Sequence, residues 1–356
     1  MTRIYLIRHA EAEGNLYRIA QGHTDGRLTK RGWEQVKALE HRFEGIHVDA
    51  VYASDLYRTR ATASAIYKPK GLLLHQDPAL REANLGVWEG MPWGEISRLD
   101  GEQLVNFSIR THLWRVAEGE TAAQVQQRLE EAVRRIGRKH DGQTIAIASH
   151  GFAIRMLLGK LQGYPLEKIG ESPQEDNTAV SLLELDGQEL RVVFRSDNSH
   201  LFSLTEKTIA RKRPSALEHG MYYCQPVLPQ QEEILEKMAD AARKETGTIG
   251  AQEEMCHTLF GFNGQEAPSA LLQMRSVGQI GMLYVLPEER QQGLGVQLIG
   301  QAVQWTLANG GQTLCIVLEE QSPAWALFAE NEFLPVKKTP EGLVILEKDL
   351  RCTSDV

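Results

Sequence analysis

Short apolar runs alternate with segments of helical periodicity throughout the first 200 residues. The runs are RIYLI at 3–7, VDAVYAS at 48–54, GLLLHQ at 71–76 and TIAIAS at 144–149. Helical segments separate them, and one can start at a Thr29 cap and carry Trp33, Val36, Leu39 and Phe43 at helical spacing. Such alternation predicts a mostly parallel sheet with helices on both faces. Thr121 and Gln124 form a capping-box signal, and the runs at 179–185 and 190–195 predict a closing hairpin.

The chain has 356 residues, which is long for a single core, and its charge balance changes near residue 200. Residues 1–200 hold 26 basic and 27 acidic side chains, whereas residues 201–356 hold 13 and 20. We therefore predict two domains, 1–203 and 218–356, joined by a polar linker at 204–217. An acidic second half argues against nucleic acid as a partner, because nucleic acid requires a basic face.

Cellular location and metal content are constrained by features that the sequence lacks. No apolar run is long enough to span a membrane, and the N-terminal residues do not resemble a signal peptide. The four cysteines are widely spaced and form no CxxC pair, which argues against a disulfide framework or a zinc site. We predict a cytoplasmic protein whose first domain needs no metal.

Arginine and histidine residues follow three of the predicted strands. Arg8 and His9 end the first strand, Arg58 lies one turn into the helix after the second, and His150 follows TIAIAS directly. Ligands of open α/β sheets collect at the carboxyl ends of the strands, so these side chains should converge. Two arginines together with helix N-termini provide what a phosphate dianion requires.

Two histidines in such a pocket allow covalent chemistry. One can attack phosphorus while the other donates a hydrogen bond to the transferring oxygens, and clustered positive charge keeps the attacking nitrogen unprotonated. Glu82, in LREANLGVWEG, is the candidate acid for the leaving oxygen. A phosphate-binding module without turnover is the alternative, but binding alone needs neither a nucleophile nor an acid.

The motifs LIRHAEAEGN, QGHTDGRLTKRG, YASDLYRTRATA, LREANLGVWEG, GET and SHGFAIR occur in an order and spacing that resemble the histidine phosphatase superfamily. The resemblance implies a three-layer α/β/α, phosphoglycerate mutase-like fold. It also implies a phosphorylated His9, a proton donor at Glu82 and a phosphate pocket completed by the residues Arg8, Asn15, Gln21, Arg58 and His150. Most members have glycine after the histidine, where this chain has Ala10, a costly exchange only if that position needs positive φ.

The segment after Glu82 bears on the reaction type. Mutases of the family carry a longer segment with tyrosine and lysine there, whereas this chain continues LGVWEGMPWGEISRLDGEQ, as the phosphatases do. We therefore predict hydrolysis of a small phosphorylated metabolite. Residues between about 88 and 118 would contact it, and an ordinary amphipathic helix that covers the sheet is an equally good interpretation of that stretch. Mutase-type phosphoryl transfer remains the alternative.

A second site is predicted from RQQGLG at 290–295, which follows an apolar strand and precedes a helix. Glycine turns before helices can hold phosphate through backbone amides. The surrounding YVLPEERQQGLGVQLI resembles the pyrophosphate loop of the GNAT N-acetyltransferases, whose domain is an α+β fold. The resemblance implies that backbone amides bind acetyl-CoA, and the residues concerned are Gln291, Gln292, Gly293, Leu294, Gly295 and Val296.

The catalytic residues of this second domain are less evident. Phe328 stands where many GNAT enzymes have a tyrosine acid, and the usual asparagine before that helix is absent. Glu319 or Glu320 could act as a base, although a solvated strand-end glutamate is the simpler interpretation. Two alternatives follow. The domain transfers an acetyl group to an amine acceptor, or it is a non-catalytic domain that binds the cofactor or has a structural role.

Overall fold

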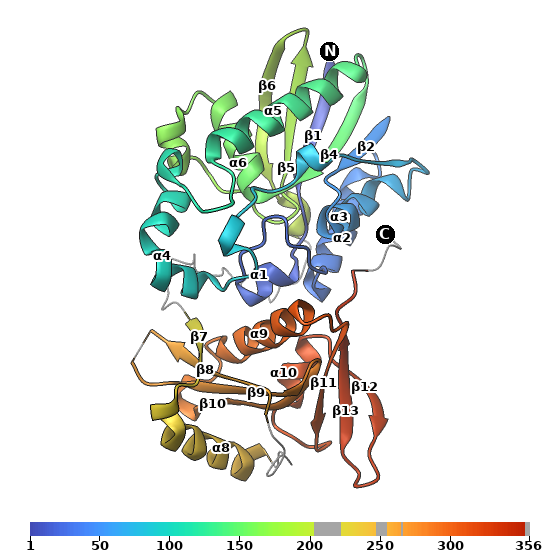
Figure 1. The fold of residues 1–356 in the computed structure, drawn as a ribbon. Helices are drawn as coiled ribbons and strands as arrows, with labels where there is room; N and C mark the ends of the chain where they lie inside the picture. The colour runs from blue at the N-terminus through green and yellow to red at the C-terminus, as the bar shows by residue number, and fades with distance from the viewer. Residues whose placement is uncertain (203–221, 247–254, 265, 353–356) are drawn as a thin grey trace.

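The structure, a computed structural model, describes residues 1–202, 222–246, 255–264 and 266–352, and these residues form two separate sheets (Figure 1). The first sheet has the strand order β3-β2-β4-β1-β5-β6. Its strands are β1 (Thr2–Arg8), β2 (Ala50–Ala53), β3 (Leu74–Gln76), β4 (Thr144–Ser149), β5 (Val180–Asp186) and β6 (Glu189–Asp197). The strands β3, β2, β4 and β1 pair in parallel, and β5 and β6 add an antiparallel hairpin.

Helices cover both faces of this sheet because its central strand is apolar on both sides. Ile4 and Leu6 of β1 pack on one face with α5 and α6, while Tyr5 and Ile7 pack on the other with α2 and α3. The helices of this part are α1 (Glu13–Tyr17), α2 (Lys30–Phe43), α3 (Tyr57–Tyr67), α4 (Trp93–Ser108), α5 (Ala122–Lys139) and α6 (Gly151–Leu161). The predicted three-layer α/β/α arrangement is therefore confirmed.

The local signals of the sequence hold with two exceptions. The Thr29 side chain caps α2 by accepting from Gly32 N, and Thr121 and Gln124 form the expected capping box of α5. Trp33 does not join the buried face of α2, since it is 40% exposed while Leu39 is fully buried. The strand predicted at 71–76 is shortened to β3, because only its last three residues pair with β2.

The second sheet has the order β12-β13-β11-β10-β9-β8-β7. Its elements are β7 (Tyr222–Pro226), α8 (Glu232–Thr246), β8 (His257–Asn263), β9 (Ala270–Ser276), β10 (Gln279–Val285), α9 (Leu294–Ala308), β11 (Thr313–Leu318), α10 (Trp325–Glu330), β12 (Leu334–Lys338) and β13 (Val344–Asp349). The helix α8 covers one face, and α9 lies between the other face and the N-terminal part (Figure 1). The strands β10 and β11 pair in parallel at only two positions and then separate.

The two parts are packed together through buried side chains. Tyr17 and Ile19, at the end of α1, belong to the hydrophobic core beneath α9, and a Cβ on Gly300 of α9 would lie 2.5 Å from Tyr17 Cβ. Lys348 of β13 is 1% exposed and forms an ion pair with Glu13 of α1 at 2.8 Å. The N-terminal part thus rests on α9 and β13 in a close, desolvated contact.

The linker predicted at 204–217 lies outside the described residues, so the domain boundaries remain a prediction. Within the described part of the chain, no helix is both long and apolar enough to cross a bilayer. The cytoplasmic location also remains a prediction.

Candidate active site

His9 follows the carboxyl end of β1 and is 6% exposed. Its Nδ1 lies 2.7 Å from the carbonyl oxygen of Ala10. A carbonyl can only accept, so Nδ1 carries the proton and the lone pair lies on Nε2. The pKa of His9 is lowered well below its usual value, first by burial and then by Arg58 and Arg8. The imidazole is therefore neutral and has a nucleophilic nitrogen.

Two arginines lie beside His9, and of these Arg58 is buried and Arg8 is partly buried. Arg58 donates to Thr24 O at 2.9 Å and Gly22 O at 2.7 Å, and its Nη1 lies 3.6 Å from Asp25. Arg8 donates from Nη1 to Glu175 O, and its buried Nε has no hydrogen-bond partner in the structure. An unsatisfied buried N–H is costly unless an anion or water accepts from it, and Arg8 lines the cavity, so Arg8 is suited to bind a phosphate oxygen.

His150 converges with His9 as expected, with ring centroids 5.3 Å apart, but its ring nitrogens contact other protein groups. It is fully buried, its Nδ1 accepts from Arg58 Nε at 3.2 Å, and its Nε2 lies 2.8 Å from Ser54 Oγ. Both ring nitrogens are thus occupied, and His150 is not part of the cavity wall that His9, Arg8 and Arg58 form. In this structure His150 accepts a hydrogen bond from Arg58 and does not line the cavity. The predicted direct contact with phosphate would require the His150 ring to give up its hydrogen bond to Arg58 or to Ser54.

Glu82 is held at the N-terminus of α6. Its Oε1 accepts from Ala83 N at 3.0 Å and Ala153 N at 2.9 Å, and its Oε2 accepts from Phe152 N at 2.9 Å. Three amides fix the carboxyl group beside the cavity that His9 lines. Oε2, with one partner, has a lone pair left for a proton.

The predicted Asn15 and Gln21 also line this cavity. Asn15 Oδ1 accepts from Ala12 N at 3.0 Å, so the side chain also shapes the start of α1. Ala10 does not belong to the residues with positive φ, and its N–H donates to Thr62 Oγ1 at 2.8 Å. The exchange of glycine for alanine therefore brings no backbone strain here.

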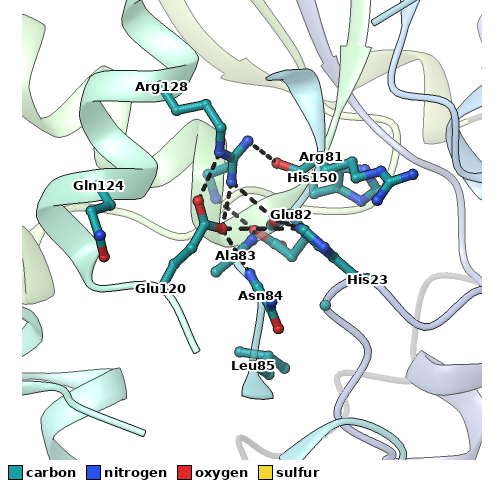
Figure 2. Close-up of polar contacts among 12 residues, drawn as sticks. His23, Arg81, Glu82, Ala83, Asn84, Leu85, Glu120, Gln124, Arg128 and His150 are labelled. Atoms are coloured by element: carbon teal, nitrogen blue, oxygen red, sulfur yellow. Dashed lines mark hydrogen bonds and ion pairs between the residues drawn. The ribbon is translucent and has the colours of Figure 1, made fainter. Parts of the chain in front are cut away.

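Figure 2 shows a support for Glu82 that the sequence analysis missed. Arg128 of α5 donates from Nη2 to Glu82 O at 3.1 Å and forms a two-point contact with Glu120. Glu120 in turn accepts from Asn84 N at 2.8 Å. These contacts join residues far apart in the chain, and their sequence signals were the separate GET and LREANLGVWEG motifs, which do not indicate that the residues meet.

Glu89 is a second residue that the sequence analysis missed. Its carboxylate accepts from the backbone amides of Gly22, His23 and Thr24 at 3.1, 2.8 and 2.9 Å. The carbonyls of this same loop hold Arg58. Glu89 therefore positions the arginine indirectly, and its only signal was its place in the quoted WEG motif.

The predicted cofactor loop lies where β10 ends and α9 begins. The first internal hydrogen bond of α9 runs from Gln297 N to Gly293 O at 3.1 Å. The backbone amides that precede Gln297 therefore have no acceptor within the helix. Gly293 has a φ of 95°, which favours glycine. The Leu294 side chain is buried in the core. The other five loop residues line a cavity, and they are Gln291, Gln292, Gly293, Gly295 and Val296.

Other predicted residues of the second domain are poorly placed for catalysis. Phe328 is 1% exposed and packs edge-on against Phe333, and Glu319 is exposed. Glu320 pairs with Lys338 at 3.0 Å. Among the described residues, no three His, Cys, Asp or Glu side chains form a group that could hold a metal ion.

Two protein families match different parts of the chain. Residues 4–198 match the histidine phosphatase superfamily (branch 1), and residues 231–333 match the acetyltransferase (GNAT) family. The two matches come in the predicted order, and the C-terminal part has a GNAT fold.

Named relatives resemble this chain over roughly half its length. Phosphoserine phosphatase 1 from Hydrogenobacter thermophilus is 29% identical over 201 residues, covering 56% of this chain and 95% of that protein. A probable phosphoglycerate mutase GpmB from Yersinia pestis is 33% identical over 168 residues, covering 46% and 77%. The structure of YhfR from Bacillus stearothermophilus is 34% identical, with a TM-score of 0.55, and covers 56% of this chain and 100% of its own.

Proposed function

Because more than half of its residues match the family model, this chain belongs to the histidine phosphatase superfamily, and we propose that it hydrolyses a small phosphate monoester through a phosphohistidine at His9. The observation that carries the proposal is the neutral, buried His9, whose Nδ1 is tied to Ala10 O and whose neighbour Arg8 has an unsatisfied N–H. No metal takes part in this scheme.

The reaction has two steps. His9 Nε2 attacks phosphorus, the ester P–O bond breaks, and the leaving oxygen takes a proton from Glu82 Oε2. Water then attacks the phosphohistidine while Glu82 takes its proton, and the P–N bond breaks to release inorganic phosphate. Arg8 and Arg58 neutralise the phosphoryl oxygens throughout, and His150 keeps Arg58 oriented.

The test is hydrolysis of p-nitrophenyl phosphate by the full chain. His9→Ala should lower kcat at least 10³-fold, an order-of-magnitude expectation for removal of a covalent nucleophile, whereas His41→Ala, at an exposed position of α2, should retain activity. Rapid acid-free quenching with ³²P-labelled substrate should trap label on the wild type alone. Full activity in His9→Ala would contradict the covalent scheme.

Mutase-type phosphoryl transfer is the alternative, and it is supported by the relative from Yersinia pestis that is named a probable phosphoglycerate mutase. It can be separated from hydrolysis by following phosphoglycerate together with its bisphosphate. Release of inorganic phosphate supports hydrolysis, and conversion between phosphoglycerates without release supports transfer.

For the second domain we propose binding of acetyl-CoA by the amides at 291–296, with acetyl transfer to an amine. The support is the GNAT match, the backbone amides that precede the first internal hydrogen bond of α9, and the separation of β10 from β11. Calorimetric titration of the full chain with acetyl-CoA tests binding. Gly293→Ala should weaken it, whereas Gly342→Ala, with a similar φ of 87° and open space around it, should not. Binding without turnover over a panel of amines would favour the non-catalytic alternative.

A further inference from the structure

The cavity that contains His9 extends across the boundary between the two parts. Its volume is about 1330 Å³, larger than a small phosphate ester requires. Its inner end is formed by Arg8, His9 and Glu82, and its outer wall includes Gln292 of the cofactor loop and Leu327 of α10. A molecule bound through its phosphate at His9 would therefore extend its leaving group towards the C-terminal domain.

A second cation lies between these two ends. Arg18, at the C-terminus of α1, lines the cavity and is partly buried. Within the described ranges no hydrogen bond or ion pair of its guanidinium is recorded, in contrast to Arg8 and Arg58. Burial lowers the pKa of Arg18, and the nearby Tyr222 acts in the opposite direction and raises it. A partly desolvated guanidinium without a carboxylate partner is suited to an anionic ligand group.

Hydrogen bonds and an ion pair hold the outer wall of the cavity in place relative to Arg18. The Tyr222 hydroxyl donates to Gln292 O at 2.7 Å and so ties the start of the C-terminal domain to the cofactor loop. The buried pair of Lys348 and Glu13 holds the helix that ends at Arg18. The cavity is thus a feature of the assembled chain, built by both parts.

Carboxylates in the same cavity restrict where a second anion can lie. Glu289 accepts from Asn263 at 2.6 Å, and Glu175 pairs with Arg195 at 2.8 Å. Glu330 is exposed at the outer end. These groups repel an anion. Arg155 and Arg290 also line the cavity, but Arg155 donates to three backbone carbonyls and Arg290 pairs with Glu245, so the surroundings of Arg18 are the favourable position.

We infer that Arg18 and the C-terminal wall form the leaving-group subsite of the phosphatase, and that its substrate is an elongated phosphomonoester with a second anionic group. The inference rests on the proposed function, and it makes the GNAT domain a determinant of phosphatase specificity. The ester phosphate lies at His9, and the second anion pairs with Arg18.

Matched substrates test this subsite in the full chain. The probes are ω-carboxyalkyl phosphates and ω-hydroxyalkyl phosphates of equal length, over a series of chain lengths, with release of inorganic phosphate as the readout. At an optimal length the carboxylate should raise kcat/KM roughly tenfold, the factor expected for a partly buried charged hydrogen bond. Arg18→Gln should bring the ratio of the two series to about one, because it removes the charge that prefers the carboxylate. General damage to the pocket would lower both series equally and leave the ratio unchanged.

Two matched controls make the test specific. Arg138→Gln, at an exposed arginine of α5 that bonds Gln188, should keep the ratio. Gln292→Glu places a negative charge on the outer wall and should lower the ratio, whereas Gln188→Glu, far from the cavity, should not.

The outcomes separate the two proposals. Hydrolysis of p-nitrophenyl phosphate with no preference for the carboxylate at any length overturns the subsite and leaves the phosphatase intact. A preference that survives Arg18→Gln overturns it as well. Failure to hydrolyse any of these esters overturns the proposed function, and the subsite with it.

Discussion

At the scale of single residues, burial controls the chemistry of the histidines. The sequence predicts a neutral His9 from the nearby arginines, but burial is the larger cause of its lowered pKa. The same cause lowers the pKa of His150 well below its usual value and that of His200 to about 4. The sequence indicated which residues converge, because a strand end is a local feature. It did not indicate how deeply they lie, because burial depends on all the elements packed above them.

These shifts predict how stability depends on pH. Below about pH 6.5 the unfolded chain binds protons at these histidines while the folded chain does not, so the free energy of unfolding should fall as the pH is lowered from 7 to 5. Each such histidine contributes up to about 1.4 kcal/mol per pH unit. Urea unfolding at several pH values measures the slope. His200→Gln should flatten it, His41→Gln at the exposed site should not, and equal slopes for all three proteins would contradict the prediction.

Gly151 is required for a reason that the sequence could not supply. A Cβ at this position would lie 3.0 Å from Arg8 Nε, the unsatisfied donor beside His9. Gly151→Ala should displace Arg8 and raise KM for p-nitrophenyl phosphate by roughly tenfold, the cost of one weakened charged hydrogen bond. Thermal stability should change little, because alanine suits the first turn of a helix. Gly101→Ala, in open space on α4, is the control and should leave KM unchanged.

At the scale of elements, capping signals and strand periodicity predicted most of the N-terminal part correctly. Thr29 and Thr121 both cap as expected, since a cap depends on residues only three positions apart. The loop at 22–24 has no such local code. Its conformation is held by Glu89, more than sixty residues later in the chain, and no periodicity could have indicated that contact.

Glu89→Ala should therefore destabilise the loop and the arginine that it supports. It leaves three partly buried amides of the loop without an acceptor, at a cost of about 2–4 kcal/mol in unfolding free energy. Because Arg58 binds the carbonyls of that loop, kcat/KM should fall as well. Urea unfolding and p-nitrophenyl phosphate kinetics measure the two effects. Glu102→Ala, exposed on α4, should change neither, and normal kinetics in Glu89→Ala would show that Arg58 does not depend on the loop.

At the scale of the whole molecule, the sequence predicted two folds but not their contact. In the sequence, Gly300 is an ordinary glycine within a helix, and Lys348 is one of three charges that end the strand VILEKD. Their roles appear only where α9 and β13 meet α1, because Gly300 accommodates Tyr17 and Lys348 pairs with Glu13. A contact between separately folded parts leaves no periodicity in either of them.

The pair of Lys348 and Glu13 predicts a link between this contact and catalysis. Lys348→Met leaves Glu13 buried without its partner, which should cost about 3–5 kcal/mol in unfolding free energy. Glu13 lies on α1 with Asn15 of the phosphate cavity, so kcat/KM for p-nitrophenyl phosphate should fall too.

The double variant Glu13→Gln/Lys348→Met removes the buried stranded charge and leaves only Glu332, the second and partly exposed partner of Lys348, so it should recover most of both losses. Lys338→Met breaks the exposed pair with Glu320 and should have little effect on either measurement. If Lys348→Met loses stability while its kinetics stay those of the wild type, the C-terminal domain supports the fold of α1 without influencing the phosphate pocket. If both fall together and both recover in the double variant, the contact between the two parts is a working component of the phosphatase.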